Sequence, residues 1–263
     1  MTAAVEYCAA IWSKRYFWFS LVKVDLRRRY RRSWLGIGWS LMHPIIMTMV
    51  FCIVFCNLFG ESITSYAPYV LSGLAFWNFF SNVMTEGCQC FYAGEHYIRQ
   101  HPAPLAIYPL RTTLGMGLHF SMAMLVLLAL VWLLHGFGNI LALWSVIPGL
   151  ALIFVLAWSV AICVGVVNVV FPDTQHLVQV GMQVLFYTTP VFYSARLLES
   201  HNLGWLVAAN PLAACLALVR APILEGHLAS LHAWGVASLA ALLAVGIAAW
   251  TLSQIERRLI FHL

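Results

Sequence analysis

Arginine side chains gather close to the N-terminus, in a segment that reads DLRRRYRR from Asp25 to Arg32. A guanidinium group binds phosphate through two parallel hydrogen bonds, which suits the phosphate of a lipid-linked substrate. The candidates for this contact are Arg27, Arg28, Arg29, Arg31 and Arg32. The alternative is that the cluster only fixes the orientation of the chain and attracts anionic lipids.

A second group of polar residues lies in the segment from residue 93 to residue 109. Within this segment it is followed by Pro102, Pro104 and Pro109. One interpretation is a solvated connector whose prolines end the neighbouring helices. The other is a segment that docks on a cytoplasmic partner. The candidates for that contact are Glu95, His96, Tyr97, Arg99 and His101.

Motifs of enzyme catalysis are missing from the sequence: it has no HExxH, paired CxxC or GxSxG pattern, and no GxxxxGK[ST] phosphate loop. We therefore expect no catalytic residue, bound metal or cofactor in this chain, and no nucleic-acid partner. If ATP drives its activity, another chain must bind the nucleotide and its Mg. Polar groups inside apolar stretches can mark a pathway or a relay, although packing beside a kink or hydration at the interface also explains them. They are His43, Glu86, His119 and His176.

The elements that must position these side chains follow from composition. Hydrophobic residues make up 62% of the 263 residues and charged residues only 9%, against roughly 25% charged in a soluble domain. A membrane-spanning helix needs about 20 apolar residues, so the chain has room for six or seven spans. The cysteines number seven, and most lie in apolar runs, which argues against a disulfide framework.

We predict an all-α polytopic membrane protein that forms a single transmembrane domain over residues 1–263. Aromatic residues at helical spacing among basic residues predict an amphipathic interfacial helix over residues 10–32. Long uncharged runs predict spans at residues 35–59, 66–91, 110–134, 141–171, 174–195 and 228–252. Pro190 and Pro211 interrupt the region between residues 174 and 219, so one span followed by re-entrant helices fits as well as two spans.

The distribution of Lys and Arg orients the chain, because these residues accumulate in cytoplasmic loops. Eight of the 14 precede Leu35. With six spans, Arg99, Arg111, Arg257 and Arg258 share that side, and only Arg196 and Arg220 lie outside. Charge alone favours six spans over seven only weakly. We expect both termini to be cytoplasmic.

Three stretches resemble the permease subunit of ABC-type polysaccharide exporters, the family that moves O-antigen, capsular polysaccharide or teichoic acid across the bacterial inner membrane. Asp25 to Pro44 is similar to the family's basic helix, Leu-Gly turn, Trp and Pro that open the first span. Phe171 to Tyr193 resembles the segment from an Asp after span four to a Pro-containing aromatic end of span five. Glu256 to Leu263, ERRLIFHL, resembles its basic-aromatic tail.

The resemblance implies a homodimer of six-span subunits in the inner membrane, with two separate nucleotide-binding ATPase subunits. It also implies a substrate entrance at the basic interfacial helix, a coupling helix within residues 93–109 and a re-entrant periplasmic gate at residues 196–226. Pro172, in place of a basic residue, and the uncharged stretch from Ala103 to Tyr108 depart from the family pattern.

In such a permease a lipid-linked polysaccharide passes through a channel lined by the first and fifth spans, where aromatic rings stack against sugars. The candidates are Phe51, Phe55, Phe59, Tyr187, Phe192 and Tyr193. Core packing or contact with lipid explains these aromatics equally well.

The expected function is therefore the channel-forming subunit of an ATP-driven exporter of lipid-linked polysaccharide. Export of a smaller lipid-linked oligosaccharide or a drug remains an alternative. A polytopic membrane enzyme acting on lipid, or an ion channel, is a further one.

Overall fold

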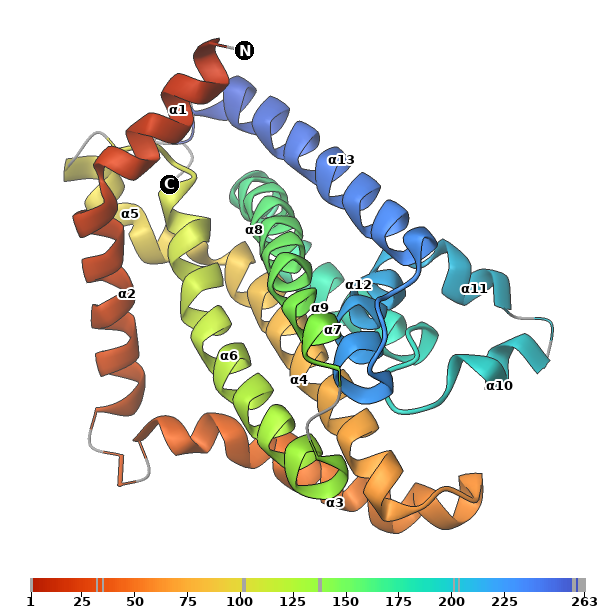
Figure 1. Ribbon diagram of the computed structural model, residues 1–263. Helices are drawn as coiled ribbons and strands as arrows, with labels where there is room; N and C mark the ends of the chain where they lie inside the picture. The colour runs from red at the N-terminus through yellow and green to blue at the C-terminus, as the bar shows by residue number, and fades with distance from the viewer. Residues whose placement is uncertain are drawn as a thin grey trace.

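The computed structural model describes residues 2–31, 33–34, 36–100, 103–136, 139–200, 202, 204–256 and 259. Over these residues the chain is built from helices and contains no strand (Figure 1). The all-α class predicted from composition is thus confirmed for the described part. The helices are α1 (Thr2–Ser13), α2 (Arg15–Tyr30), η1 (Gly36–Gly38), α3 (Trp39–Phe59), α4 (Ile63–Cys88), α5 (Cys90–Gln100), α6 (Ile107–His135), α7 (Ile140–Trp144), α8 (Val146–Val170), α9 (Thr174–Thr188), α10 (Ala195–Ser200), α11 (Gly204–Ala209), α12 (Pro211–Arg220), η2 (Ala221–Glu225) and α13 (Leu231–Ile255).

Among the described residues, four helical stretches are long and apolar enough to cross a membrane: Trp39–Cys56, Ile107–His135, Ala142–Val170 and Leu231–Ile255. The six-span prediction also counts α4 and α9, and this count stays a prediction. The predicted fifth span, 174–195, is helical only as far as Thr188. Pro190 explains this end, because proline disfavours a helical residue before it and has no N–H to donate.

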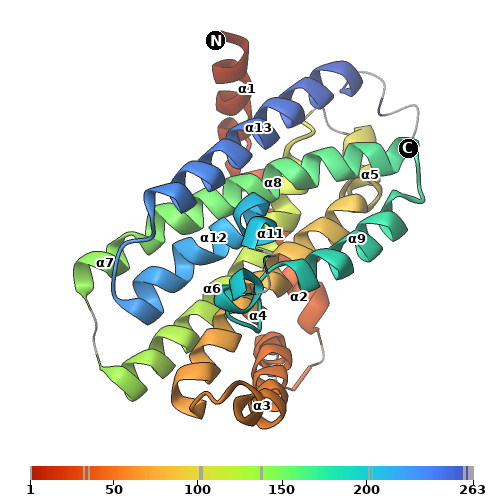
Figure 2. The same ribbon diagram turned by 90° about the vertical axis from the view of Figure 1, so that its right-hand side faces the viewer.

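Helix α4 is the centre of the fold, and it packs against α3, α6, α8 and α9. Gly87 of α4 and Gly165 of α8 bring two of these helices close together, since a Cβ at Gly165 would lie 2.8 Å from the Gly87 carbonyl oxygen. Small residues allow such close approach between helices in lipid. Helix α13 lies along α8 and α12 (Figure 2) and buries a face of alanines against them.

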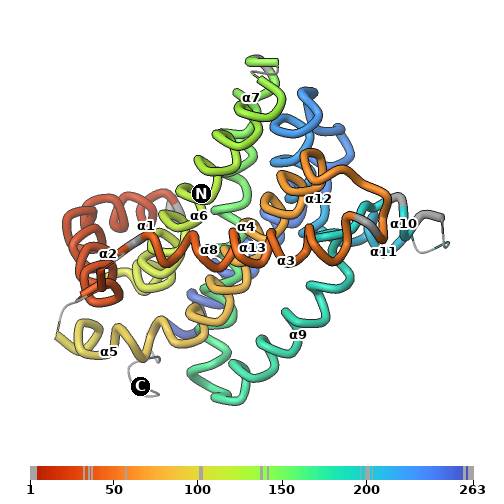
Figure 3. The backbone as a smooth tube through the Cα atoms, turned by 90° about the horizontal axis from the view of Figure 1, so that it is seen from below, coloured from red at the N-terminus to blue at the C-terminus, as the bar shows by residue number. Residues whose placement is uncertain are grey.

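The predicted interfacial helix over residues 10–32 is divided at Lys14 into α1 and α2. Helix α2 lies beside α6. Helix α3 then crosses the bundle near the start of α4 and the end of α6 (Figure 3). Leu21 and Val22 are the buried residues of α2, whereas Tyr16 and Phe19 are 78% and 52% exposed. Tyr16 and Phe19 of the aromatic stripe therefore face away from the protein, as contact with lipid would require. Tyr30, at the end of the stripe, instead packs against His119 of α6, with ring centroids 5.7 Å apart.

Candidate functional site

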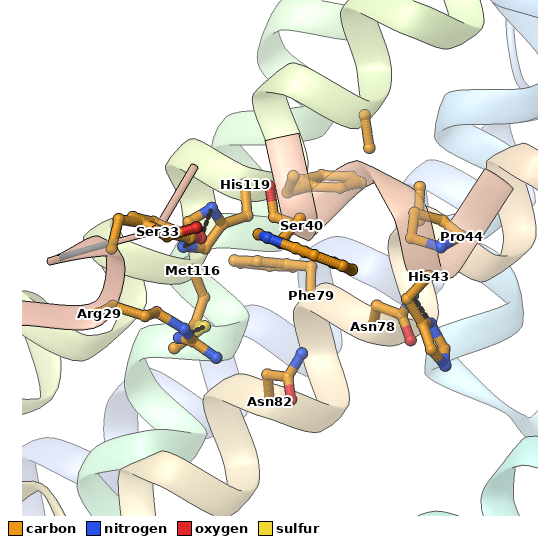
Figure 4. Close-up of a pocket in the computed structure, with 15 residues that line it drawn as sticks. Arg29, Ser33, Ser40, His43, Pro44, Asn78, Phe79, Asn82, Met116 and His119 are labelled. Carbon is orange, nitrogen blue, oxygen red and sulfur yellow. Dashed lines mark hydrogen bonds between the residues drawn. The ribbon is translucent and has the colours of Figure 1, made fainter. Parts of the chain in front are cut away.

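Two neighbouring cavities open between α2, α3, α4 and α6. The first has a volume of about 580 Å³ and reaches from Arg29 to His43 and Asn78 (Figure 4). The second, of about 520 Å³, is lined by Arg28, Glu86 and residues around them. Both cavities share Arg29, Met116 and His119. They form one groove along the inner side of α2, which we call the α2 groove.

The structure separates the predicted arginine cluster into two sets. Arg28 and Arg29 line the α2 groove, and Arg29 approaches the Met116 sulfur at 3.6 Å. Arg27 and Arg31 are exposed and are not among the residues that line either cavity. Arg32, the fifth candidate, lies outside the described residues. Arg28 and Arg29 are thus the pair that a ligand in the groove would meet.

An ion pair holds α2 against α6. Both Asp25 carboxylate oxygens accept hydrogen bonds from the Arg111 guanidinium group in a bidentate arrangement. The Arg111 side chain is 9% exposed and that of Asp25 is 38% exposed. The remaining guanidinium nitrogen, Nη1, is buried and has no partner in the described part of the chain. The Asp25 carboxylate is therefore the main counter-charge of a nearly buried cation.

We expect Asp25→Asn to loosen α2 and to destabilise the protein by roughly 1–3 kcal/mol, which is less than for a fully buried pair because Asp25 is partly exposed. A disulfide engineered between α2 and α6 should then form more slowly, and Tm should fall. Glu95→Gln is the matched control, since the Glu95–Arg99 pair is exposed on both sides. An unchanged Tm in Asp25→Asn would contradict this role. Exchanging the two charges, Asp25→Arg with Arg111→Asp, should recover part of the loss.

The aromatic candidates gather where α3 meets the end of α9. Phe51, Phe55 and Phe59 stack in series with ring centroids 5.5 Å apart, and Phe192 lies 5.2 Å from Phe51. Tyr193 packs edge-on against Phe192 and is buried, whereas Tyr187 is 62% exposed. Phe186 and Trp77, which the sequence analysis did not single out, join the same cluster.

Arg220 fixes the broken end of α9. Its guanidinium group donates to the carbonyl oxygens of Pro190 and Val191, each at 2.6 Å. It also donates to the Ser72 hydroxyl at 3.1 Å and the Tyr69 carbonyl at 2.9 Å, and lies 3.6 Å from the centre of the Tyr69 ring. Sequence analysis placed Arg220 in an outer loop, but it is only 7% exposed. It thus acts as a buried cross-link between α12, α4 and the segment after α9.

The first part of the segment predicted to dock on a partner, residues 93–100, belongs to helix α5. Cys90, Phe91, Gly94 and Ile98 are buried, whereas His96 and Arg99 are exposed and Glu95 forms an ion pair with Arg99 at 2.9 Å. Tyr97 instead packs against Phe17 of α2, with ring centroids 6.0 Å apart. His101 lies outside the described residues. The polar face of α5 is therefore open at this end of the molecule.

A polar junction beside α5 joins α1 to the residue that follows α13. The Tyr7 hydroxyl donates to the Glu256 carboxylate at 3.0 Å. Burial, with a further contribution from this carboxylate, raises the pKa of Tyr7, so the phenol remains a donor at neutral pH. The Leu105 N–H also donates to Glu256 at 3.3 Å. The turn that follows α5 is thus tied to both α1 and the C-terminal segment.

Sequence reasoning missed Asn78 and Asn82, which line the groove from α4. The signal was present, because Asn78, Asn82 and Glu86 recur every four residues and so share one face of a helix. Only Glu86 was singled out, since a single Asn in an apolar run is usually satisfied by neighbouring groups.

Comparison with known proteins agrees with the permease resemblance. The family model for the ABC-2 type transporter matches residues 16–224. The chain is 27% identical over 205 residues to the O-antigen export system permease protein RfbA of Klebsiella pneumoniae, covering 78% of each chain. It is 24% identical to RfbA of Myxococcus xanthus, over 80% of each chain. It is 19% identical to the polysialic acid transport protein KpsM of Escherichia coli, over 78% of this chain and 80% of KpsM. Because the family match takes in most of the sequence, from α2 to η2, the chain belongs to the ABC-2 type transporter family.

Proposed function

We propose that this chain is the membrane-spanning, channel-forming subunit of an ATP-driven exporter that moves lipid-linked polysaccharide of the O-antigen or capsule type across the bacterial inner membrane. The observation that carries this proposal is the similarity to relatives named for O-antigen export and polysialic acid transport, which covers 78–80% of both chains in each case. The family match supports a transporter rather than a membrane enzyme.

In the proposed arrangement two copies of the chain associate with two ATPase subunits, and those subunits bind ATP and Mg. The chain crosses the membrane six times through α3, α4, α6, α8, α9 and α13, with both termini in the cytoplasm. The basic end of α2 supports this orientation, because Lys and Arg are retained on the cytoplasmic side. The short helices α10, α11 and α12, which fall largely within residues 196–226, belong to a gate in the outer leaflet.

The second cavity of the groove lies at the C-terminal end of α4, whereas the first cavity reaches Ala75 and Asn78 in the middle of the helix, next to Trp77 of the aromatic cluster. Glu86, Gln89 and Arg29 line the groove near Cys88, the end of α4. Tyr66, which packs against Phe59, lies near Ile63, where α4 begins. In this orientation a lipid-linked glycan enters at the α2 groove, with Arg28 and Arg29 on its phosphates. The sugar chain then leaves past Phe51, Phe55 and Phe192.

Helix α5 is the proposed docking site for the ATPase subunit. Its exposed polar face and its close contact with α6 favour this role, because a displacement of α5 by the ATPase subunit would be transmitted directly to α6. A Cβ at Gly94 would lie 2.4 Å from the Tyr108 ring, so α5 rests tightly on the first turn of α6. The junction of Tyr7, Glu256 and Leu105 braces the same turn.

The function is tested by copurification and by a deletion. A soluble ATPase should copurify with the tagged chain, and deletion of the gene should leave undecorated glycan inside the cell. Reversing the exposed charge of α5 with Arg99→Glu should reduce the copurified ATPase several-fold, whereas Thr251→Val, on α13, should leave it unchanged. Turnover of a lipid substrate by the purified chain alone would contradict the transporter proposal.

A further inference from the structure

A polar stripe runs along α4 on the side that faces the α2 groove. Asn78, Asn82 and Glu86 lie four residues apart, which places them on one face of the helix. Asn82 and Glu86 are exposed and Asn78 is half-buried. Exposed polar side chains on a membrane helix are costly unless they meet polar partners or a hydrophilic cavity. This face of α4 therefore needs a polar occupant.

The larger cavity of the groove supplies the space. The Asn78 amide nitrogen lies 3.3 Å from the His43 imidazole of α3, which closes one side of the cavity. In Figure 4, Asn82 lies between Arg29 on one side and Asn78 and His43 on the other, with its amide toward the open middle. Asn82 makes no hydrogen bond to any residue that the structure describes. Its donor and acceptor atoms are both available to a ligand.

Aromatic side chains form part of the remaining wall. Trp39 lines the cavity and is 56% exposed, and Phe79 and Phe120 stack with ring centroids 4.9 Å apart behind it. An amide can both donate to and accept from a hydroxyl group. An exposed indole offers a negative face to polarised C–H bonds. The combination of the free Asn82 amide and the neighbouring Asn78 amide with an exposed indole matches a sugar ring better than a lipid tail or an inorganic ion.

The charges around the cavity determine the orientation in which such a ligand would bind. Arg29 lines both cavities, and Arg28 lines the smaller one beside it. The two acidic residues of the smaller cavity differ in their surroundings, because Asp25 is neutralised by Arg111 whereas Glu86 has no basic partner in the described residues. Glu86 accepts hydrogen bonds from hydroxyl groups and repels phosphate. The phosphates are thereby directed to Arg28 and Arg29, and the adjoining sugar to Asn78 and Asn82.

We propose that the 580 Å³ cavity binds the sugar that is attached directly to the phosphate group of the lipid-linked substrate. Its size is within the range of small-molecule sites. Asn82 and Asn78 hydrogen-bond to the hydroxyl groups, and Trp39 stacks against the ring. This assignment rests on the proposed function, but it makes the α2 groove selective for the first sugar and not only for phosphate.

The test compares two probes on the chain reconstituted with its ATPase subunit: a polyprenyl pyrophosphate carrying one hexosamine, and the same pyrophosphate without sugar. Wild type should bind the sugar-bearing probe about 10-fold more tightly, as two uncharged hydrogen bonds would give. The double variant Asn78→Leu, Asn82→Leu, which keeps the side-chain shape, should lose this preference and still bind the bare pyrophosphate. The double variant Arg28→Gln, Arg29→Gln should weaken both probes. Thr251→Val, whose hydroxyl bonds to its own helix, is the control.

A second measurement does not depend on the leucine variants folding. Asn82→Cys, in a chain whose exposed Cys8 is replaced by serine, should react with a thiol reagent from the groove. The sugar-bearing probe should protect this thiol and the bare pyrophosphate should not.

Equal binding of the two probes by wild type would overturn the sugar site and leave the phosphate site intact. Binding of neither probe would overturn the proposed function itself. If the asparagine variants changed the oligomeric state and kept the sugar preference, the stripe would be an interface between copies, and the sugar site would be wrong.

Discussion

Replacing Arg220 with leucine is expected to lower Tm by roughly 5–10 °C and to abolish export. The Val191 carbonyl oxygen has Arg220 as its only hydrogen-bond donor in the described chain, and the Pro190 oxygen has otherwise only the Tyr69 hydroxyl at 3.5 Å. Each buried acceptor left unpaired costs about 1–3 kcal/mol. Leucine avoids the desolvation of a buried cation, which offsets part of this cost. The remaining loss of stability affects the segment after α9, which carries Phe192 and Tyr193.

The measurement is the melting temperature of the purified chain together with export in cells. Arg220→Lys should be intermediate, because an ammonium group keeps the charge but cannot reach acceptors on three segments at once. Arg99→Leu is the matched control for the melting temperature, and not for export, because Arg99 belongs to the proposed docking face. This arginine is 52% exposed and forms its ion pair with Glu95, so its loss should cost about 0.3–0.5 kcal/mol. A melting temperature of Arg220→Leu equal to that of Arg99→Leu would contradict the cross-link.

Gly73→Ala gives an independent check on the same contact. A Cβ at this position would lie 2.1 Å from the Val191 carbonyl oxygen and 2.5 Å from the Arg220 guanidinium group. The substitution should therefore push the segment after α9 away from α4 without removing any charge. Loss of export in both Gly73→Ala and Arg220→Leu would place the effect in the position of this segment.

The apolar runs predicted the helical class and the approximate place of α3, α6, α8 and α13, because a long uncharged run can bury its backbone polar groups only as a helix. Pro190 also predicted the interruption after α9. A coupling helix within residues 93–109 was implied by the family resemblance alone, although Phe91, Gly94 and Ile98 follow a helical period that the sequence itself offers. The helix begins earlier than expected, at Cys90, and ends at Gln100, before the three prolines at residues 102–109.

Charge counting treated Arg111 and Arg220 as loop residues, whereas both lie in helices and are buried. Arg111 lies near the start of α6 and pairs with Asp25, and Arg220 is surrounded by carbonyl groups. Neither partner set was visible in the sequence. Asp25 is 86 residues away from Arg111, and the acceptors of Arg220 are backbone oxygens that any residue type supplies. Buried cations of this kind weaken span counts that depend on one or two charges.

The arginine cluster lies where the structure has the α2 groove, but only the folded chain shows which of its arginines face the groove. The position of each side chain around the end of α2 decides which ones face inward, and the contacts of α2 with α6 set that rotation. Leu21, Val22 and Asp25 fix the protein-facing side of α2. Arg28 and Arg29 follow on the groove side, whereas Arg27 and Arg31 do not.

Replacing both Arg28 and Arg29 with glutamine is expected to reduce export by at least 100-fold. Hydrogen bonds to a charged group contribute about 1.5–3 kcal/mol each, and two such losses correspond to a factor of roughly 10²–10⁴ in the affinity for the phosphates. The exposed position of both arginines should leave folding and ATPase assembly intact. Export is measured as glycan at the cell surface, and affinity as binding of a polyprenyl pyrophosphate to the purified complex.

The double variant Arg27→Gln, Arg31→Gln is the matched control, because it removes the same charge from the same end of α2 outside the two cavities. If the arginines act only by fixing the orientation of the chain and by attracting anionic lipids, both double variants should lose export equally. If phosphate is bound in the groove, the loss should be confined to Arg28 and Arg29. Arg28→Lys with Arg29→Lys then separates charge from shape, since lysine keeps the charge and lacks the planar fork. Full export with both lysines would remove the guanidinium-specific contact and leave a site that recognises charge alone.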